Sequence, residues 1–516
     1  MVATAASIAI RGGLPGCIWW SHEGPHDRLA NGCLTNMGLR RQAISGAGWT
    51  AVATLVTVVA QLLQIAILAR LLRPEDFGLM ALVTVVFGLA HVYADGGLSS
   101  AIVHRQDATH EQLSSLFWLN VGAGVVMAVV LVAAAPLVAF VYAEPELTSL
   151  IALAALAFLV TPVGQQLHMR LQKALRFGFL AVTDVLSATA GVTVSVTLAL
   201  HGYGVLSLVW GFLAGALVRT AALVWFGMRD WQPQLRFRFS DLRGFLRFGA
   251  FQMGERTVNY LSANLDKLLI GSLLGAHALG LYSVAFQLVM KPMRVVNPIF
   301  NRVAFPLFAK VQTDKPRLRA GFLDGIRTIS FVLFPVYAGI IVLGEPLILL
   351  VLGETWRAAV PLLQVLAVLG FFYSLGNPLG SLLLATGRVE IGFYLNIWRL
   401  LLFAAAIFVG VRWDILGVAV ALVAATALGM FPLGFVVRWI LVEMRPTEYI
   451  RAFAPMLITA LVMAAAVLLA RDLELGVAAG AIGELVVLIA IGGALYLAIA
   501  ITWQRRFFAK LMDTLR

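Results

Sequence analysis

Charged residues are scarce in this 516-residue chain: they make up 12% of it, whereas hydrophobic residues make up 61%. Soluble proteins contain about 25% charged residues, so the composition excludes a soluble globular protein. Cysteine is scarcer still, because Cys17 and Cys33 are the whole set. Two cysteines in a polar tail provide neither a disulfide framework nor a metal site. We therefore expect no metal ion and no other cofactor.

Motifs for nucleotide-driven or catalytic chemistry are also missing. The chain has no Walker A pattern, which excludes an ATP-driven pump within it. It also lacks HExxH, GxSxG and the Asp-x-Asp pattern of many sugar-nucleotide transferases. The segments between its apolar runs are too short to hold an active site or a soluble domain. These absences predict a protein that is not an enzyme.

Long apolar segments dominate what is present. A membrane-spanning helix needs about 20 apolar residues, and no alternating in/out pattern of a membrane barrel is visible. The sequence therefore predicts an all-α polytopic membrane protein with about 14 transmembrane helices. The predicted segments are 44–71, 76–94, 113–142, 148–170, 177–200, 204–228, 247–274, 277–309, 320–343, 355–386, 389–411, 414–438, 449–470 and 478–503.

The net charge of +12 could indicate nucleic-acid binding, but the positions of the charges argue against it. Basic residues such as Lys173, Arg176 and Arg317 gather in the loops on one side, and the opposite loops contain few. This is the positive-inside distribution of a multi-pass protein. It predicts that both termini lie in the cytoplasm and that the lipid bilayer, not nucleic acid, is the partner.

Two stretches of the sequence repeat each other. "LARLLRPEDFGLMALVTVV", from Leu68, aligns with "IGSLLGAHALGLYSVAFQL", from Ile270, and the alignment pairs Gly78 with Gly280. Six spans separate the copies, so both have the same orientation in the membrane. This predicts two parallel six-helix lobes around a central cavity, followed by two extra C-terminal helices.

The repeat sets the predicted domain organisation. Residues 1–43 are polar and rich in glycine and proline, which indicates either a disordered cytoplasmic extension or an artefact of start-site choice, since Met37 reads as a natural beginning. The remaining predicted units are the N-terminal lobe 44–228, a cytoplasmic linker 229–246, the C-terminal lobe 247–440, and two extra helices with a cytoplasmic tail, 441–516.

Helix-breaking residues occur at matched places in the two lobes. "TPVGQQ" contains Pro162 and Gly164, and "NPLGSL" contains Pro378 and Gly380. Proline removes a helix hydrogen bond and kinks the helix. Matched interruptions point to a transport pathway, but proline and glycine are also common in membrane helices for packing alone. Both interpretations remain open.

Charged and polar residues inside the predicted spans concentrate in the second lobe. A charge at the bilayer centre costs on the order of 3 kcal/mol, so these side chains should avoid lipid and line a wet cavity. An excess of cations in such a cavity suits a phosphate or pyrophosphate. The candidate cations are Lys267, Lys291, Arg294, Arg256, Arg302 and Arg399, and the candidate polar or gating residues are Glu255, Asn259, Asp266 and Asn301.

The first lobe contributes a polar but cation-poor face. Its candidates are Gln61, Gln64, Asp95 and Asp184, whereas Arg219 is expected near a helix end, where it can reach the interface. Asp95, Asp184 and Asp266 are candidates for coupling to a proton or sodium gradient. Alternatives remain open for several residues: Asp266 pairs with Lys267 or locks the bundle, and Arg399 is structural or contacts a ligand.

Several phrases resemble a known family. "ARLLRPEDFGLMAL", "YADGGLSSAIV", "LQKALRFGFLAV" and "NLDKLLIGSLLGAHALGLYSVAFQL" are similar to polysaccharide flippases of the MOP superfamily, specifically the Wzx-like lipopolysaccharide and exopolysaccharide exporters. The resemblance covers roughly residues 38–300. It implies two six-helix lobes that alternate access around a central cavity.

The resemblance also implies a function, the transfer of an undecaprenyl-pyrophosphate-linked oligosaccharide from the cytoplasmic to the periplasmic leaflet. In the bacterial inner (plasma) membrane, Lys267, Lys291 and Arg294, with Arg256 as a fourth candidate, would then hold the pyrophosphate and sugar head group. Asp266 and Glu255 would keep these cations oriented and could gate lobe closure, and other polysaccharide-assembly membrane proteins would be partners. One rival is a cation-coupled multidrug antiporter of the same superfamily, which would need an acidic cavity. A second rival is an integral-membrane polysaccharide polymerase or transferase, which the short outer loops disfavour.

Overall fold

The computed structural model describes residues 52–95, 109–174, 176–229, 231–239, 243–473 and 480–503. Within these ranges every regular element is helical and none is a strand, so the predicted all-α class is confirmed. A chain in hydrocarbon must satisfy its backbone groups internally, and a helix does so within one apolar run. The predicted extension 1–43, both cysteines and the side chain of Asp95 lie outside the described part.

The first half of the chain, as we use the term, runs from residue 52 to the end of α9. The helices are Val52–Leu71, α3 (Pro74–Asp95), α5 (His110–Tyr142), α6 (Glu146–Ala155), α7 (Ala157–Lys173), α8 (Phe177–Leu200) and α9 (Val205–Gly227).

The second half begins with α10, the longest helix. Its helices are α10 (Arg243–Lys310), α11 (Lys315–Val351), α12 (Ala359–Ala385), α13 (Val389–Gly410), α14 (Asp414–Ala425), α15 (Phe431–Val442), α16 (Pro446–Asp472) and α17 (Gly480–Trp503). A π-helical turn, Thr426–Met430, joins α14 to α15.

Twelve helical segments in the described ranges are long and apolar enough to cross a membrane. Two of them, Met253–Lys310 and Glu390–Val442, have 58 and 53 residues, whereas about 20 residues suffice for one crossing. The first contains a break at Gly275, with φ 81° and ψ 179°. The second contains Asp414 at φ 60°. A count of 14 requires both segments to fold back at these breaks, and it stays a prediction.

The two prolines that were predicted to break helices both lie inside helices. Pro162 lies inside α7, and the interruption of that span is at Leu156, between α6 and α7. Pro378 lies inside α12. The carbonyl of Leu375, close to this proline, accepts hydrogen bonds from Arg438 Nη2 at 2.9 Å and Tyr449 Oη at 3.2 Å. Side chains from α15 and α16 therefore bond to the backbone of α12 about one turn before Pro378.

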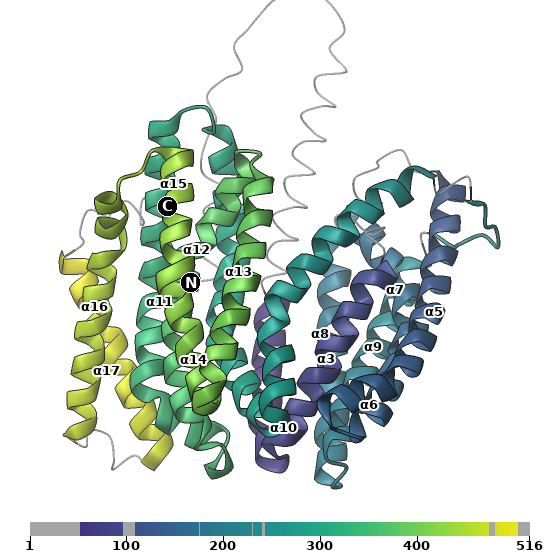
Figure 1. The fold of residues 1–516 in the computed structure, drawn as a ribbon, viewed down its shortest axis with the longest axis horizontal. Coiled ribbons are helices and arrows are strands. Elements are labelled where there is room, and N and C mark those ends of the chain that lie inside the picture. Colours follow the sequence, from purple (N-terminus) through teal and green to yellow (C-terminus); the bar gives the residue numbers. More distant parts are fainter. Residues whose placement is uncertain are drawn as a thin grey trace, which may run out of the picture.

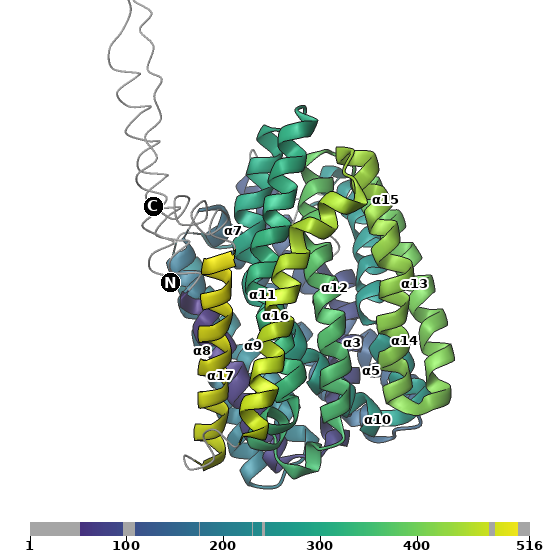
Figure 2. The same ribbon diagram turned by 90° about the vertical axis from the view of Figure 1, so that its left-hand side faces the viewer.

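The helices form two groups with α10 between them (Figure 1), and α16 and α17 lie at the outer side of the second group, which faces the viewer in Figure 2. Helices α3 to α9 stand on one side, and α11 to α17 stand on the other. In the described part, α10 contacts the first group mainly through α3 and the second group mainly through α12 and α13. The division into two parallel six-helix lobes stays a prediction.

The contact between α3 and α10 brings the two sequence repeats together. A Cβ atom on Gly78 would lie 1.9 Å from the carbonyl oxygen of Ala276, and one on Gly280 would lie 1.8 Å from that of Pro74. The repeat aligns Pro74 with Ala276 and Gly78 with Gly280, so the two close approaches are reciprocal. We call this region the sealed end. Only glycine allows the backbones to lie so close.

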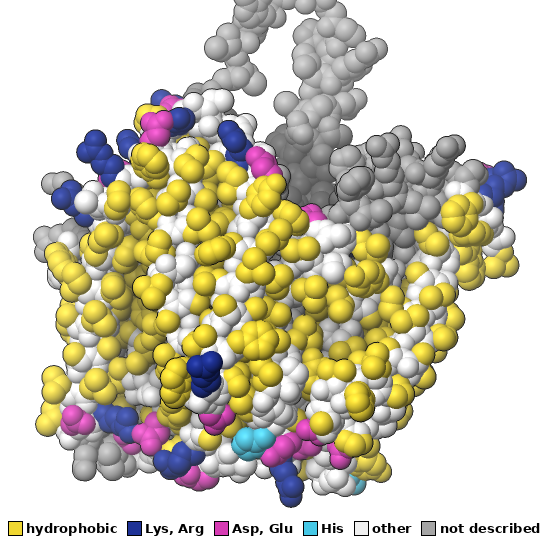
Figure 3. All heavy atoms as spheres, in the orientation of Figure 1, with side chains coloured by type: hydrophobic (Ala, Val, Ile, Leu, Met, Phe, Trp, Pro, Cys, Tyr) yellow, Lys and Arg dark blue, Asp and Glu magenta, His cyan; other side chains and the backbone are white. Residues whose placement is uncertain are grey.

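Further bonds reinforce the sealed end. Glu75 Oε1 and His277 Nδ1, which the repeat also aligns, lie 2.7 Å apart. The buried Trp356 donates from Nε1 to the carbonyl of Ala69 at 2.7 Å, and its ring packs edge-on against Phe77. Figure 3 shows a broad hydrophobic belt between two charged rims, as a membrane environment requires.

Candidate functional site

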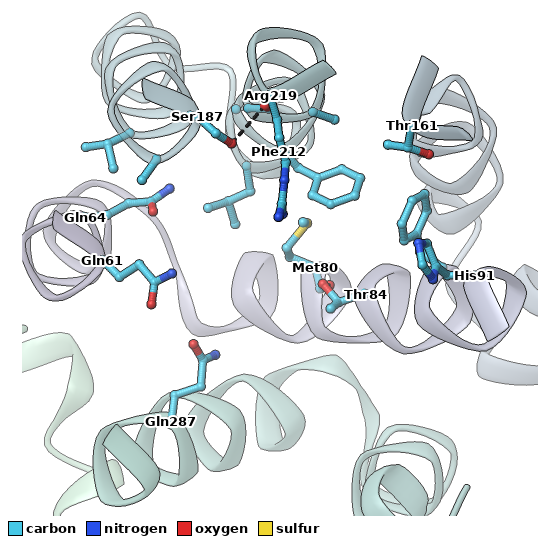
Figure 4. A pocket seen from close by; sticks show the side chains of 18 of the residues that line it. Gln61, Gln64, Met80, Thr84, His91, Thr161, Ser187, Phe212, Arg219 and Gln287 are labelled. Atoms are coloured by element: carbon cyan, nitrogen blue, oxygen red, sulfur yellow. Dashed lines mark hydrogen bonds between the residues drawn. The ribbon is translucent and has the colours of Figure 1, made fainter. Parts of the chain in front are cut away.

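A cavity of about 820 Å³ lies between the helix Val52–Leu71, α3, α7, α8, α9 and α10. Leu68 and Phe77 line it next to the sealed end. Figure 4 shows Gln61 and Gln64 on one side of this space, Arg219 in the middle, and His91 with Thr161 on the far side. Other polar lining residues are Thr84, Gln165, His168, Ser187, Thr220, Lys267, Ser283, Gln287, Lys291 and Arg294.

Three cations on α10 face the cavity. Lys291, only 6% exposed, donates from Nζ to Gln61 Oε1 across the gap between α10 and the first described helix. Lys267 donates from Nζ to Asn264 Oδ1 at 2.9 Å. Within the described ranges, none of Lys267, Lys291 and Arg294 forms an ion pair with a carboxylate. We call these three residues, with Ser283 and Gln287, the cavity face of α10.

Arg219 corrects the sequence interpretation of the first half. It lies within α9 and lines the cavity, so it does not sit at a helix end as predicted. Its Nη2 lies 3.2 Å from Asp184 Oδ1, and both side chains are roughly half exposed. Both also line a second hollow of about 500 Å³ that shares Gln61, His168 and Ser187 with the cavity. In the described part, the first half therefore contributes one cation to the cavity lining, and this cation is paired with a carboxylate.

Seven of the predicted second-lobe residues do not line this cavity. They are Glu255, Arg256, Asn259, Asp266, Asn301, Arg302 and Arg399. Arg302 is exposed, and Arg399 has a buried Nε without a partner in the described part. The helical stripe through Glu255, Asn259 and Asp266 was predicted to line the cavity, and its placement is corrected here.

Two residues of that stripe, and also Asn301, bond to other side chains of the protein instead. Asn259 Oδ1 accepts from Asn396 Nδ2 at 2.7 Å, which ties α10 to α13. Asp266, 8% exposed, accepts from the fully buried Tyr282 Oη at 2.7 Å. Asn301 Oδ1 accepts from Ser381 Oγ at 2.9 Å, which ties α10 to α12. We call Asn259, Asp266, Tyr282 and Asn301 the bonded face of α10.

The structure resolves the alternatives left open for Asp266 in favour of helix locking. Its carboxylate bonds to Tyr282 rather than to Lys267, although the two residues are adjacent in sequence. Successive residues of a helix point about 100° apart, so Lys267 reaches the cavity while Asp266 turns into the second half. Of the other coupling candidates, Asp184 pairs with Arg219, and the side chain of Asp95 is outside the described part.

Sequence reasoning missed several lining residues. Gln287 was detectable, because it lies one helical turn before Lys291 and must share its face. Gln165 and His168 lie three residues apart on α7 and could have been found in the same way. His91 and Thr161 gave no such signal, because each is a single polar residue within an apolar run. Of the predicted helix-break residues, Gly164 packs against Thr220 and Leu223, and Gly380 has open space around it.

The sequence matches a family model described as "Polysaccharide biosynthesis protein" over residues 67–361, which is more than half of the chain. The chain belongs to this family. It is 37% identical over 374 residues to lipopolysaccharide biosynthesis protein WzxC of Escherichia coli (strain K12), covering 72% of this chain and 76% of that protein. It is 35% identical over 429 residues to teichuronic acid biosynthesis protein TuaB of Bacillus subtilis (strain 168), covering 82% and 88%.

A solved structure shares the fold of this polysaccharide biosynthesis family member. The inward closed conformation of lipid II flippase MurJ superimposes with a TM-score of 0.71. The match covers 89% of this chain and 99% of that one, at 17% sequence identity. At this identity the likeness establishes the fold alone. The expected resemblance to the polysaccharide flippases, made from sequence phrases, is thereby confirmed at the level of family and fold.

Proposed function

We propose that this protein is a flippase that moves undecaprenyl-pyrophosphate-linked oligosaccharide repeat units across the bacterial inner membrane for surface polysaccharide biosynthesis. The observation that carries the proposal is the cavity face of α10. Lys267, Lys291 and Arg294 point into a polar cavity without carboxylate partners in the described part. Membership of the polysaccharide biosynthesis family supplies the chemical class of the cargo.

Anionic cargo explains why these charges are tolerated. Each intramembrane cation costs on the order of 3 kcal/mol unless something compensates it. A pyrophosphate would compensate all three, since lysine acts as a point charge and arginine adds a bidentate fork. The volume of about 820 Å³ lies within the range of ligand cavities, about 300–1,000 Å³. Neutral glutamine, threonine and histidine side chains remain for the saccharide.

The proposal includes an orientation. The loops at the end opposite the sealed end contain Arg176, Arg317 and Arg445, so we place that end, and both termini, in the cytoplasm. The sealed end would then close the periplasmic side, and transport would require it to open. Neighbouring polysaccharide-assembly membrane proteins would supply and remove the cargo.

The rival functions fit the cavity less well. A multidrug antiporter for cationic drugs needs acidic side chains, and the described lining of the cavity contains neither aspartate nor glutamate. A polymerase or transferase needs groups that transfer a proton or attack the substrate, and it needs loops that hold a second substrate. The cationic lining instead favours binding and release without covalent chemistry.

Replacement of Lys291 and Arg294 by alanine tests the proposal. In a strain lacking the chromosomal gene, the double variant should insert normally yet abolish polysaccharide export, because the pyrophosphate loses two of its three compensating charges. Lipid-linked repeat units should accumulate on the cytoplasmic leaflet. The measurement is the amount of these lipids, together with surface polysaccharide.

A matched control removes the same two charges elsewhere. Lys310 and Arg412 are exposed and outside the cavity, so Lys310→Ala with Arg412→Ala should export normally. Full export from the Lys291→Ala/Arg294→Ala variant would refute the proposed role of the cavity. Equal loss from both double variants would show that total charge, and not the site, matters.

A further inference from the structure

A small notch extends from the side of the cavity where His91 and Thr161 lie. It has a volume of about 20 Å³ and lies between α3, α5 and α7. It shares His91, Thr161 and Gln165 with the main cavity and is completed by Ala94, Asn120, Phe158 and Pro162. Figure 4 shows His91 and Thr161 on the side of the cavity away from Gln61, the hydrogen-bond partner of Lys291. The cavity therefore has a cationic side and a neutral polar side.

Asn120 is the unusual residue of the notch. Its side chain is 3% exposed, and neither Oδ1 nor Nδ2 has a hydrogen-bond partner within the described part. Buried amides are almost always bonded, so an unpartnered one points to an absent ligand or water. Oδ1 needs a donor and Nδ2 needs an acceptor. A hydroxyl group or a water molecule supplies both, whereas a metal cation would satisfy Oδ1 and face the Nδ2 donor unfavourably.

The walls of the notch are fixed by backbone geometry. Pro162 has no N–H, so the carbonyl of Phe158 lacks its helical partner. A Cβ on Gly124, one turn beyond Asn120, would lie 2.4 Å from that carbonyl oxygen. Glycine at this position lets α5 approach α7 and holds Asn120 beside the opening. The helix-breaking residue that the sequence singled out thus forms part of a polar recess.

We propose that this notch is the saccharide-reading subsite of the flippase and that Asn120 is its specificity-determining residue. The inference rests on the proposed function: the pyrophosphate lies at Lys267, Lys291 and Arg294, and a sugar hydroxyl enters the notch. A volume of about 20 Å³ accommodates one water-sized group. A free hydroxyl fits, and an acetamido or other bulky substituent at that ring position is excluded.

The hydroxyl gives selectivity because it replaces a water without loss of hydrogen bonds. A site built to bond a hydroxyl rejects analogues that lack it far more strongly than an apolar pocket rejects a missing methylene. The notch therefore separates recognition of the sugar from recognition of the phosphate. Removal of the Asn120 amide should weaken recognition of the sugar and leave recognition of the phosphate unchanged.

Binding to purified full-length protein in detergent provides the test. The two probes are undecaprenyl pyrophosphate without a sugar and the native lipid-linked repeat unit, extracted from the bacterium in which the protein occurs. We expect Asn120→Leu, which has nearly the same shape, to weaken binding of the repeat unit about tenfold or more and to leave the sugar-free lipid unaffected. Thr161→Val, at the rim, should act in the same direction with a smaller effect and guards against misfolding of the first variant.

The Lys291→Ala/Arg294→Ala variant separates failure of this inference from failure of the proposed function. That variant should weaken both probes, and if it weakens neither, the flippase function itself is refuted. Equal weakening of both probes by Asn120→Leu and Thr161→Val would overturn the subsite. A lower melting temperature with unchanged binding of both probes would also overturn it, because the notch would then hold a buried water only.

Discussion

The two faces of α10 carry similar polar residues, but one face lines the cavity and the other is hydrogen-bonded to neighbouring parts of the protein. On the cavity face, Lys267, Gln287 and Lys291 border open space. On the bonded face, Asn259 and Asp266 are bound to neighbouring side chains. The difference lies in what stands opposite each face: Asn396 on α13 bonds Asn259, and Tyr282, beyond the break at Gly275, bonds Asp266, whereas the cavity lies opposite Lys267 and Gln287. A polar residue in a membrane helix therefore marks a site only where the neighbouring helices leave its bonding capacity unused.

The largest expected effect comes from separating α10 from α3. Gly78→Ala or Gly280→Ala places a methyl group against a backbone carbonyl at under 2 Å, so the sealed end cannot close and export should be lost. Labelling of Ser283→Cys, on the cavity face, by a membrane-impermeant thiol reagent added outside the cell measures the opening. The background should carry Cys17→Ser and Cys33→Ser.

Gly339 provides the control for this experiment. It lies inside α11, and a Cβ there would meet no atom within 4 Å. With Gly339→Ala added, the Ser283→Cys protein should therefore be labelled, and should export polysaccharide, at the same rate as without it. If the Gly78→Ala protein labels no faster than the Gly339→Ala protein, the close backbone contact is not what closes this end.

A pair of substitutions on α10 compares its two faces directly. Tyr282→Phe leaves Asp266 without its hydrogen bond, which should lower the free energy of unfolding by about 1.5–3 kcal/mol with little change in export per folded molecule. Gln287→Leu, five residues later, should lower export and leave stability nearly unchanged. Thermal unfolding in detergent and export in the deletion strain distinguish them. The comparison fails if both variants change the same quantity.

The smallest expected effect concerns the ion pair of the sealed end. Glu75 and His277 are roughly half exposed, and exposed pairs contribute about 0–1 kcal/mol. Glu75→Gln should therefore change the labelling rate of Ser283→Cys by no more than about fivefold. An effect as large as that of Gly78→Ala would mean that the charge, rather than the backbone contact, holds this end closed.

The sequence predicted the helical class and five of the lining residues: Gln61, Gln64, Lys267, Lys291 and Arg294. Hydropathy was sufficient for the class because lipid permits few alternatives. It was insufficient for the stripe through Asn259 and Asp266, because periodicity identifies a polar face without identifying its neighbour. Asn396, the partner of Asn259, lies 137 residues away along the chain, and Tyr282, the partner of Asp266, lies beyond the break at Gly275.

Two other predictions failed for related reasons. Arg219 was assigned to a helix end from its position in an apolar run, but the structure places it inside α9, paired with Asp184 on α8. The break in the fourth predicted span was assigned to Pro162 and lies at Leu156. Proline alters the hydrogen bonding of a helix, yet packing decides where the helix ends.

The reciprocal glycine contact of the sealed end has the geometry of a two-fold homodimer interface contained within one chain. In such an interface residue i touches j while j touches i, as Gly78 touches Ala276 and Gly280 touches Pro74. Residues on the axis meet their own equivalents, so identical charges there would repel. Duplication into one chain removes that restriction. The two copies differ at this position, Glu75 in one and His277 in the other, and the pair that would repel as two glutamates is joined by a hydrogen bond.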